Sequence, residues 1–407
     1  MCASVLTAAV LAVLELGPAI AKKAFNASDA EVALMTMGQG AGMLLTFWTA
    51  HLASRHSQLA LVFWPELLAR CVLVATFFVQ PGFALVYVLI HALAQTLQLM
   101  TMPARISVYR FNYPPEYRGR IVGRNRQLQL ITTAILALLI SEGLEACLEG
   151  GFLHRSFGMD VVPAVRLVIP IMATIGVAGS AIFRFIPIRA QDRANNETAA
   201  SLKKTTKHFV RIWREDHRFR RYQIYFCTFG FANIMSIPLT QIHAVDFLDA
   251  DYPDMALINV VLVQGVMALT MPFWGRKLDR HSPLSLRAIL NLFAAADYLI
   301  FAIAPTISWV YFGRVFRGIA FGGGSLVWML GSLHFAKNRQ DVPIYLGIHS
   351  VLTGARWLVA PALGVFMKKL FADDARPVFV LSATIMIVCA FLMLRDVKRE
   401  KNSAESQ

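Results

Sequence analysis

Ionisable side chains occur inside several apolar runs of this sequence, where a charge is unfavourable and its presence needs an explanation. A charged side chain at the centre of a bilayer is costly, so such residues pair with one another or line a polar pathway. The residues concerned are Glu15, Glu66, Arg70, His91, Arg166, His243, Asp297, Arg314, Arg317, His349 and Arg356. They are the candidates for ligand binding and proton transfer.

Three of the arginines have positions that suit an anion-binding site. Arg314 and Arg317 are three residues apart and therefore share one face of a helix. Arg356 lies 14 residues into the run 342–366, near the middle of a membrane-spanning helix. Guanidinium groups bind carboxylate and phosphate in bidentate fashion, so these arginines predict an anionic ligand. The alternative is structural, with Arg314 paired to Asp297.

Other polar side chains in the apolar runs extend this candidate site. His91, Gln95 and Gln241 are included among the candidate substrate-binding residues, with hydrogen bonding between helices as the alternative for Gln95. Glu15 and His243 are the candidates for proton coupling, because a carboxylate and an imidazole both titrate when their surroundings change. For Glu15, the simpler alternative is that it neutralises an arginine.

Two acidic residues have a structural explanation. Glu66 and Arg70 are four residues apart, so they face the same way on a helix and predict a self-neutralising pair. Asp297 is expected to pack against another helix rather than to carry protons. We therefore leave all three residues out of the candidate site.

The composition predicts an all-α polytopic membrane protein. The chain has 407 residues, of which 57% are hydrophobic and 16% charged, and its mean hydropathy is +0.54. A soluble domain has about 45–50% apolar and about 25% charged residues. The five cysteines form no CxxC or metal-ligand spacing, and the sequence contains no ATP-binding loop, HExxH or GxSxG. We expect no enzyme, no cofactor and no metal site.

Twelve apolar runs approach or reach the length of about 20 residues that a helix needs to cross a bilayer. The predicted spans are 3–20, 31–51, 58–79, 83–104, 121–141, 162–183, 222–245, 255–274, 284–304, 307–333, 342–366 and 375–394. They form an N-terminal half (1–183) and a C-terminal half (222–394) of six helices each, with a central linker (184–221) and a tail (395–407). Ala19-Ile20-Ala21 is similar to a signal-peptidase site, but no basic segment precedes the first run, so we expect it to remain a helix.

Two sequence echoes predict that the halves are pseudo-symmetric repeats. The dipeptide Phe47-Trp48 and the tripeptide Arg55-His56-Ser57 recur as Phe273-Trp274 and Arg280-His281-Ser282. Val86-Tyr87 recurs as Val310-Tyr311 at nearly the same offset. Two matches at nearly one offset indicate an internal duplication of a six-helix bundle.

The distribution of basic residues predicts the orientation. Of the 39 Lys and Arg residues, 28 lie in loops and helix ends on one side of the predicted membrane and six on the other. By the positive-inside rule the first side, with both termini, faces the cytoplasm. We therefore expect an integral plasma (inner) membrane protein and attribute the net charge of +14 to topology rather than to nucleic-acid binding.

The central linker contains one amphipathic stretch. Residues 199–222 mix many basic residues with Phe209 and Trp213, which predicts a helix lying on the anionic inner leaflet. The alternative is a solvated linker that only connects the halves. The expected partners are thus membrane lipids and a small-molecule substrate, with no nucleic acid, for a chain acting as a monomer.

Twelve helices in two halves, inner termini and a long central loop resemble the major facilitator superfamily over essentially the whole chain. That family carries a glycine, an acidic residue four positions later and an arginine in the loops after its second and eighth helices. Gly275, Asp279 and Arg280 match this motif, whereas in the first half Ala50 and Ser54 replace the glycine and the acid. The gating residues that the resemblance implies are Arg55, Gly275, Asp279 and Arg280.

Two further motifs strengthen the resemblance and indicate a function. Arg314 and Gly318 match the family's Arg-x-x-x-Gly in the tenth helix, and Gly354, Pro361 and Gly364 are similar to its pattern in the eleventh. The resemblance implies a secondary transporter that works by alternating access, with an anionic solute and proton coupling as finer expectations. The run 121–141 lacks the Gly-Pro pair of proton-driven drug antiporters. The alternative is a non-transporting membrane assembly or scaffold protein, which the altered first-half loop favours.

Overall fold

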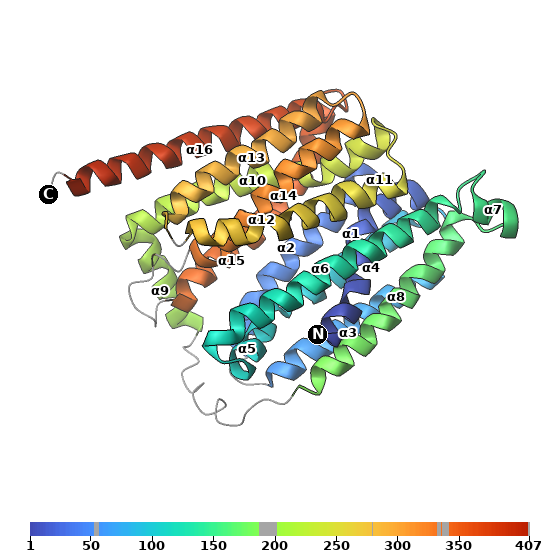
Figure 1. Ribbon diagram of the computed structural model, residues 1–407, viewed down its shortest axis with the longest axis horizontal. Coiled ribbons are helices and arrows are strands. Elements are labelled where there is room, and N and C mark those ends of the chain that lie inside the picture. Colours follow the sequence, from blue (N-terminus) through green and yellow to red (C-terminus); the bar gives the residue numbers. More distant parts are fainter. Residues whose placement is uncertain (53–56, 187–201, 279, 332–334, 336–341, 406–407) are drawn as a thin grey trace. The chain divides into compact units, whose positions relative to one another are not determined.

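A computed structural model describes residues 1–52, 57–186, 202–278, 280–331, 335 and 342–405. Regular structure throughout these ranges is helical, and no strand occurs within them. The contacts divide the chain into two compact units (Figure 1). The first comprises Met1–Ala199 with Gln241–Val261, and the second Ala200–Thr240 with Leu262–Gln407.

The first unit is built from the N-terminal helices. These are α1 (Cys2–Phe25), α2 (Asp29–Leu52), α3 (Gln58–Val74) with the 3₁₀ turn η1 (Ala75–Phe78), α4 (Ala84–Met100), α5 (Met102–Asn112), α6 (Pro115–Glu145), the short α7 (Phe152–Phe157) and α8 (Val161–Arg184). Helix α1 packs against α6 and α8, α3 packs against α4 and α8, and α2 packs against α4. The unit also contains α11 (Tyr252–Ala256) and the π-helical turn η3 (Leu257–Val261).

The second unit holds most of the C-terminal helices. These are α9 (Leu202–Glu215), α10 (His217–Asp246, up to Thr240), α12 (Leu262–Leu278), α13 (Pro283–Ile303), α14 (Ile307–Gly331), α15 (Val342–Leu370) and α16 (Arg376–Glu405). Helix α13 packs against α14 and α16, and α12 packs against α14. Because α10 runs through both units, its last residues belong with the first one.

The helices agree with the predicted membrane architecture. Nine helical segments of the described chain are long and apolar enough to cross a bilayer. Helices α2, α10 and α14 have 24, 30 and 25 residues and lie at three further predicted spans. All twelve predicted spans therefore coincide with a helix or with consecutive helices, as an all-α polytopic protein requires.

Several helix ends extend beyond the predicted spans. Helix α6 begins at Pro115 rather than at 121, because proline at the first helical position is preorganised for a helix start. Helix α10 begins at His217 rather than at 222. Helix α16 continues to Glu405, well beyond 394, because no glycine or proline follows to stop it.

Helix α9 occupies the part of the linker for which a surface helix was predicted. Its Ile212 is buried with Phe219, Tyr345 and Ile348, and Phe209 and Trp213 pack on the same cluster. The Tyr345 hydroxyl donates to Asp216 Oδ2 at 2.7 Å, directly beyond the end of α9. The apolar face of α9 therefore packs on protein, and lipid contact through its basic residues stays a prediction.

Close helix packing depends on glycine in both units. A Cβ atom at Gly38 would lie 2.6 Å from the Ala92 carbonyl oxygen, where α2 meets α4. A Cβ atom at Gly318 would lie 2.5 Å from Val266 Cβ, where α14 meets α12. Without a hydrophobic force between helices in lipid, small residues let the backbones approach and gain van der Waals contact.

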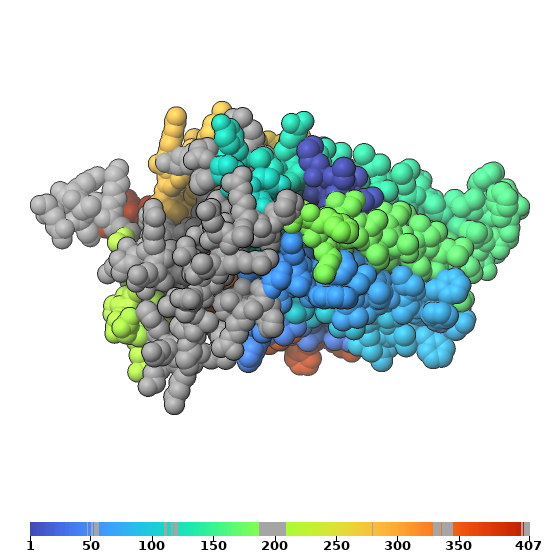
Figure 2. Space-filling view, turned by 90° about the horizontal axis from the view of Figure 1, so that it is seen from below, coloured from blue at the N-terminus to red at the C-terminus, as the bar shows by residue number. Residues whose placement is uncertain are grey.

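Apolar side chains cover the outer surface of the first unit. Figure 2 shows α8 in green beside α3 in blue on one face of the molecule. Trp64 and Phe78 at α3 and η1 are 59% and 73% exposed, and Ile171 of α8 is 53% exposed. Such large exposed apolar side chains indicate a surface that faces lipid rather than water.

The predicted orientation can be tested with cysteines introduced one at a time into a variant that keeps Cys147 as its sole native cysteine. Ser156 in α7 and Asn402 in α16 are both exposed. If both termini are cytoplasmic, an impermeant maleimide added to intact cells labels Ser156→Cys, whereas Asn402→Cys is labelled only after permeabilisation. Labelling of Asn402→Cys in intact cells would contradict the orientation.

Native Cys147 provides an internal reference for this experiment. Its thiol is buried between α6 and α7, and burial raises the pKa of the thiol, with the Asp160 carboxylate adding to the shift. Since only the thiolate reacts quickly, Cys147 should label far more slowly than the introduced cysteine in α7.

Candidate functional site

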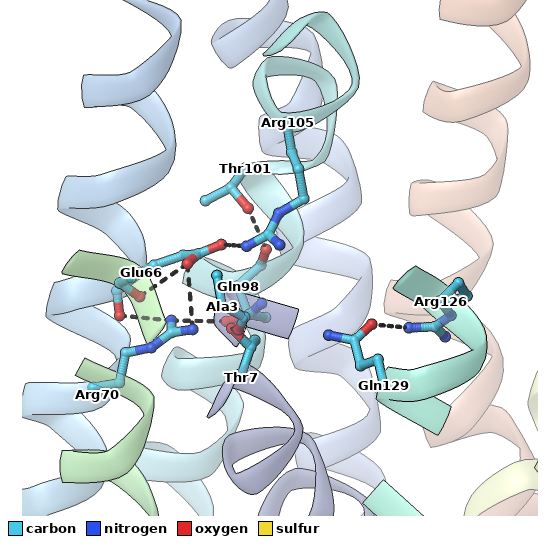
Figure 3. A network of polar contacts seen from close by, with 10 residues as sticks. Ala3, Thr7, Glu66, Arg70, Gln98, Thr101, Arg105, Arg126 and Gln129 are labelled. Atoms are coloured by element: carbon cyan, nitrogen blue, oxygen red, sulfur yellow. Dashed lines mark hydrogen bonds and ion pairs between the residues drawn. The ribbon is translucent and has the colours of Figure 1, made fainter. Parts of the chain in front are cut away.

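A polar network around one buried carboxylate joins four helices of the first unit (Figure 3). Glu66 of α3 accepts hydrogen bonds from the guanidinium of Arg105 in α5 and from the Ser180 hydroxyl of α8, the latter at 3.0 Å. Arg70 Nη2 lies 3.3 Å from the Glu66 carboxylate, and Arg70 Nη1 donates to Gln98 of α4 at 2.9 Å. The pair predicted from its spacing is therefore present and structural, and it is completed by a second arginine.

In the second unit, a buried carboxylate is likewise paired with two arginines. Asp297 Oδ2 of α13 is 3.2 Å from Arg314 Nη1 and 3.9 Å from Arg317 Nη1, both on α14. Arg317 also donates to Asn233 Oδ1 of α10 at 2.7 Å and to the Tyr298 hydroxyl at 3.0 Å. Two of the three arginines predicted to bind an anion therefore have a protein carboxylate as their partner, which is the structural alternative.

The third arginine lies elsewhere in the second unit. Arg356 Nη1 of α15 donates to the Phe226 carbonyl at 2.7 Å, and Nη2 lies 3.3 Å from the Thr353 hydroxyl. Its guanidinium lies over the Phe226 ring at 4.7 Å. A Cβ atom at Gly230 of α10 would overlap this guanidinium, so glycine makes room for it. Among the described contacts, Arg356 shares none with Arg314 or Arg317.

His91 and Gln95 of α4 are fixed against α1 in the first unit. His91 Nε2 lies 3.0 Å from the Leu14 carbonyl oxygen and 3.0 Å from Gln95 Nε2. Both side chains are at least nine-tenths buried. A Cβ atom at Gly17 would overlap the imidazole, so glycine at this position allows the close contact. The structure thus brings these two predicted residues together at the middle of α1.

Glu15 is the accessible carboxylate of α1. It is exposed although its neighbours Leu14 and Leu16 are buried, and it interacts electrostatically with Arg126 of α6. Arg126 Nη1 donates to Gln129 Oε1 at 2.8 Å (Figure 3). The predicted span 121–141 already includes Arg126, close to its start. Helix α6 begins earlier, at the proline start signal of Pro115, so Arg126 lies three turns inside the helix.

A second polar group, the Lys22 cluster, joins the end of α1 to the segment 241–261. Lys22 Nζ lies 2.8 Å from Asp29 Oδ1 and 2.8 Å from Asp246 Oδ2. Lys23 Nζ donates to the Ala250 carbonyl at 2.7 Å and lies 4.9 Å from the centroid of the Tyr252 ring. The cluster comprises Lys22, Lys23, Asp29, Asp246, Ala250, Tyr252 and Glu145 of α6, whose carboxylate accepts from the Tyr252 amide at 3.0 Å.

Asp251 caps the N-terminus of α11 beside this cluster. Its carboxylate accepts from the Asp254 amide at 2.6 Å, while Asp254 accepts from the Asp251 amide in return. Burial raises the pKa of Asp251, and the carboxylates of Asp254 and Glu145 raise it further. The folded segment therefore retains a proton that an unfolded Asp251 has already lost, and it loses stability as pH rises through the raised pKa.

The other predicted residues of α10 lie in the same segment. Gln241 exchanges two amide hydrogen bonds with Asn259 of η3, at 2.7 and 3.0 Å. His243 is 4% exposed and stacks on Phe247 at 4.8 Å. Gln241 thus connects α10 to η3, and His243 lies one turn before the Asp246 carboxylate of the Lys22 cluster.

The predicted gating residues are described only in part. A Cβ atom at Gly275 would meet Leu326 Cδ1 at 3.9 Å, an ordinary contact, so no close approach requires glycine there. The Arg280 side chain is exposed. Arg55 and Asp279 lie outside the described residues. The gate assigned to these four residues stays a prediction.

The described helices and buried ion pairs define a polytopic α-helical membrane protein with accessible charged groups on helices that cross the bilayer. Nowhere in the described ranges do three or more His, Cys, Asp or Glu side chains gather where they could hold a metal ion. Two overlapping matches to the family model of the Major Facilitator Superfamily cover residues 1–342 and 224–407. The chain belongs to that superfamily.

Known structures share this fold along nearly the whole chain. The nucleoside transporter NupG matches with 13% identity, covering 97% of this chain and 98% of that chain, at a TM-score of 0.69. The inward-open xylose transporter XylE from E. coli matches with 12% identity over 97% and 93%, at 0.67. A bacterial homologue of the human lysosomal transporter Spinster matches with 15% identity over 97% and 95%, at 0.66.

One characterised relative is similar in sequence over a shorter region. The class H tetracycline resistance protein of Pasteurella multocida is 24% identical over 147 residues. This match covers 35% of the present chain and 36% of the relative.

The Asp297 group predicts a large cost for removing its carboxylate. Asp297→Asn leaves Arg314 and Arg317 buried without a countercharge, so we expect a loss of about 3–5 kcal/mol in the free energy of unfolding. Reversible unfolding in mixed micelles measures this value. Asp249→Asn, a change of an exposed acid, is the control and should lie within about 0.5 kcal/mol of the parent.

A double variant separates charge from packing. Adding Arg314→Gln to Asp297→Asn removes one of the two unpaired cations and should recover part of the lost stability. Additive losses in the double variant would contradict the charge argument.

The Lys22 cluster predicts local rather than global weakening. Lys22→Gln removes the cation shared by two carboxylates, so the segment 241–261 should open more readily. We expect roughly fivefold faster amide hydrogen exchange there, the equivalent of about 1 kcal/mol. Arg376→Gln removes an exposed ion pair with Asp374 and should leave exchange in this segment unchanged. Equal exchange in the parent and Lys22→Gln would show that the cluster does not hold the segment.

Proposed function

We propose that this protein is a secondary transporter that moves a small solute across the inner membrane by alternating access, with proton coupling at Glu15. Membership of the superfamily supports the transport function. The single observation that carries the coupling is the accessible Glu15 carboxylate beside Arg126, on two helices that cross the membrane.

The three carboxylates inside apolar helices differ in their surroundings. Glu66 and Asp297 are fully buried, and each has arginine partners within ion-pair distance. Glu15 differs from both, because its side chain is exposed and makes no hydrogen bond in the described structure. A carboxylate whose surroundings change between two conformations changes its proton affinity, which is the requirement for coupling.

Helices α1 and α6 connect this carboxylate with the Lys22 cluster. Glu15 and Arg126 lie along the same two helices whose ends carry Lys22 and Glu145. Protonation of Glu15 removes its attraction for Arg126 and thereby alters how α1 and α6 are held together. With the predicted topology, the Lys22 cluster lies at the outer face, where its release would free the segment 241–261 from both helices.

The coupling is tested on purified protein in proteoliposomes loaded with a pH-sensitive dye. A ligand-stability screen first identifies a solute, and proton movement and solute exchange are then measured with that solute. Glu15→Gln should move protons at least tenfold more slowly while exchanging solute across the membrane at a rate near that of the parent. Glu142→Gln, at an exposed carboxylate of α6, is the matched control and should behave like the parent.

Two outcomes would contradict the proposal. Normal proton movement by Glu15→Gln would remove Glu15 from the coupling step. Absence of flux by the parent for every solute that stabilises it would favour the alternative of a non-transporting membrane assembly or scaffold protein.

A further inference from the structure

We propose that Arg287 and Arg356, with Tyr222 and His349, bind a carboxylate or phosphate group of the transported solute. This inference rests on the proposed transport function and adds the chemical class of the substrate. All four residues belong to the second unit, on α10, α13 and α15.

Arg287 is a buried cation that lacks a countercharge in the described structure. It lies one turn inside α13 and is 7% exposed. Its guanidinium lies over the rings of Phe226 and Phe229, at 4.7 and 4.2 Å, and the described residues provide it with neither a hydrogen bond nor a carboxylate. A buried cation without a partner costs several kcal/mol, so a ligand is the simplest reason for its presence.

Arg356 places a second cation on the same aromatic ring. Its guanidinium carbon is 4.7 Å from the Phe226 centroid, as is that of Arg287, so the two cations are within twice that distance of each other. Arg356 is 8% exposed, and its hydrogen bonds go to the oxygen atoms of Phe226 and Thr353 and to the Cys227 thiol, none of which is a carboxylate. Two like charges this close in a buried place repel one another, and an anion between them would remove that repulsion.

Hydrogen-bonding groups surround these two arginines. The Tyr222 hydroxyl and His349 Nε2 are buried and make no hydrogen bond in the described structure. His349 Nδ1 lies 3.1 Å from Gln223 Oε1, so this nitrogen is the donor if the imidazole is neutral, and Nε2 then accepts. The Tyr222 hydroxyl donates to an anionic oxygen directly, whereas neutral His349 accepts a hydrogen bond from a protonated oxygen of the solute.

Aromatic rings hold the guanidinium groups in position. Phe226 lies edge to face with His349 at 4.5 Å, and Trp328 of α14 lies 5.7 Å from the same imidazole. Cation–π contact occupies the flat face of a guanidinium and leaves its N–H edge for a ligand. The site therefore suits a solute with one anionic group, which the arginines bind through their N–H edges.

Arg287 and Arg356 differ from the arginines of the two structural ion pairs. Glu66 meets Arg70 and Arg105, and Asp297 meets Arg314 and Arg317, so each of these arginine pairs contains its own carboxylate. Arg287 and Arg356 form a third pair in which the described protein supplies none. The solute would bring the missing anion, and the arginine pair would then resemble the other two.

Thermal unfolding of the purified full chain tests this site. Inorganic phosphate and succinate are the anionic probes, and sorbitol is the uncharged control. We expect an anion to raise the Tm of the parent in a saturable way, with an apparent affinity at least tenfold weaker in Arg287→Gln and Arg356→Gln. Arg376→Gln, an exposed arginine of the same unit, should respond as the parent does.

The variants also report on a purely structural role. Removing an unpaired buried charge should leave the Tm without anion equal or higher, whereas removing a structural arginine should lower it. Arg287→Lys keeps the charge but loses the planar fork, so it should not restore anion binding. A lower Tm in the Gln variants with an unchanged anion response would overturn the proposal.

The phosphate of a lipid headgroup is the other anion that would bind these arginines. Repeating the measurement in nanodiscs of neutral lipid, with and without phosphatidylglycerol, distinguishes the two sources. Stabilisation by phosphatidylglycerol alone would overturn a solute site. Transport of an uncharged solute with no response to any anion would overturn the site and leave the transport function intact, whereas anion binding without flux of any solute would overturn only the transport function.

Discussion

A buried carboxylate held between two arginines is the interaction on which each unit depends. Glu66 ties α3 to α5, and Asp297 ties α13 to α14. Taking these charges out of water is so costly that the pairs are stable only when every partner is in place. They therefore set the position of neighbouring helices along one another, a task that non-directional apolar packing in lipid performs poorly. That the same kind of pair recurs in both units agrees with the internal duplication.

Arginines that are paired with a buried carboxylate differ from those that have no such partner. In a chain where four arginines are paired with buried carboxylates, Arg287 and Arg356 differ because neither has such a carboxylate among the described residues. Glu15 is the converse case, an exposed carboxylate between two buried leucines of α1. The candidate groups for solute binding and proton coupling are thus charged residues that take no part in the structural ion pairs.

Helices α1 and α6 connect the middle of the first unit with one end of it. Glu15 and Arg126 interact along these helices, while Lys22 and Glu145 hold the segment 241–261 at their ends. A change in charge at Glu15 therefore acts on the same pair of helices that the Lys22 cluster uses. A rigid helix transmits such a change directly, because displacement of one turn displaces the whole element.

The sequence by itself determined the helical spans and the repeat, because hydropathy, run length and proline or glycine signals act locally. It also predicted the pairing of Glu66 with Arg70, which are one helical turn apart. The tertiary structure alone decided which distant groups meet. Glu66 and Arg105 are 39 residues apart, Asp297 and Arg314 are 17, and Arg356 and Phe226 are 130. No local pattern distinguishes an arginine that reaches a carboxylate from one that stacks on a phenylalanine, because that choice depends on how the helices pack.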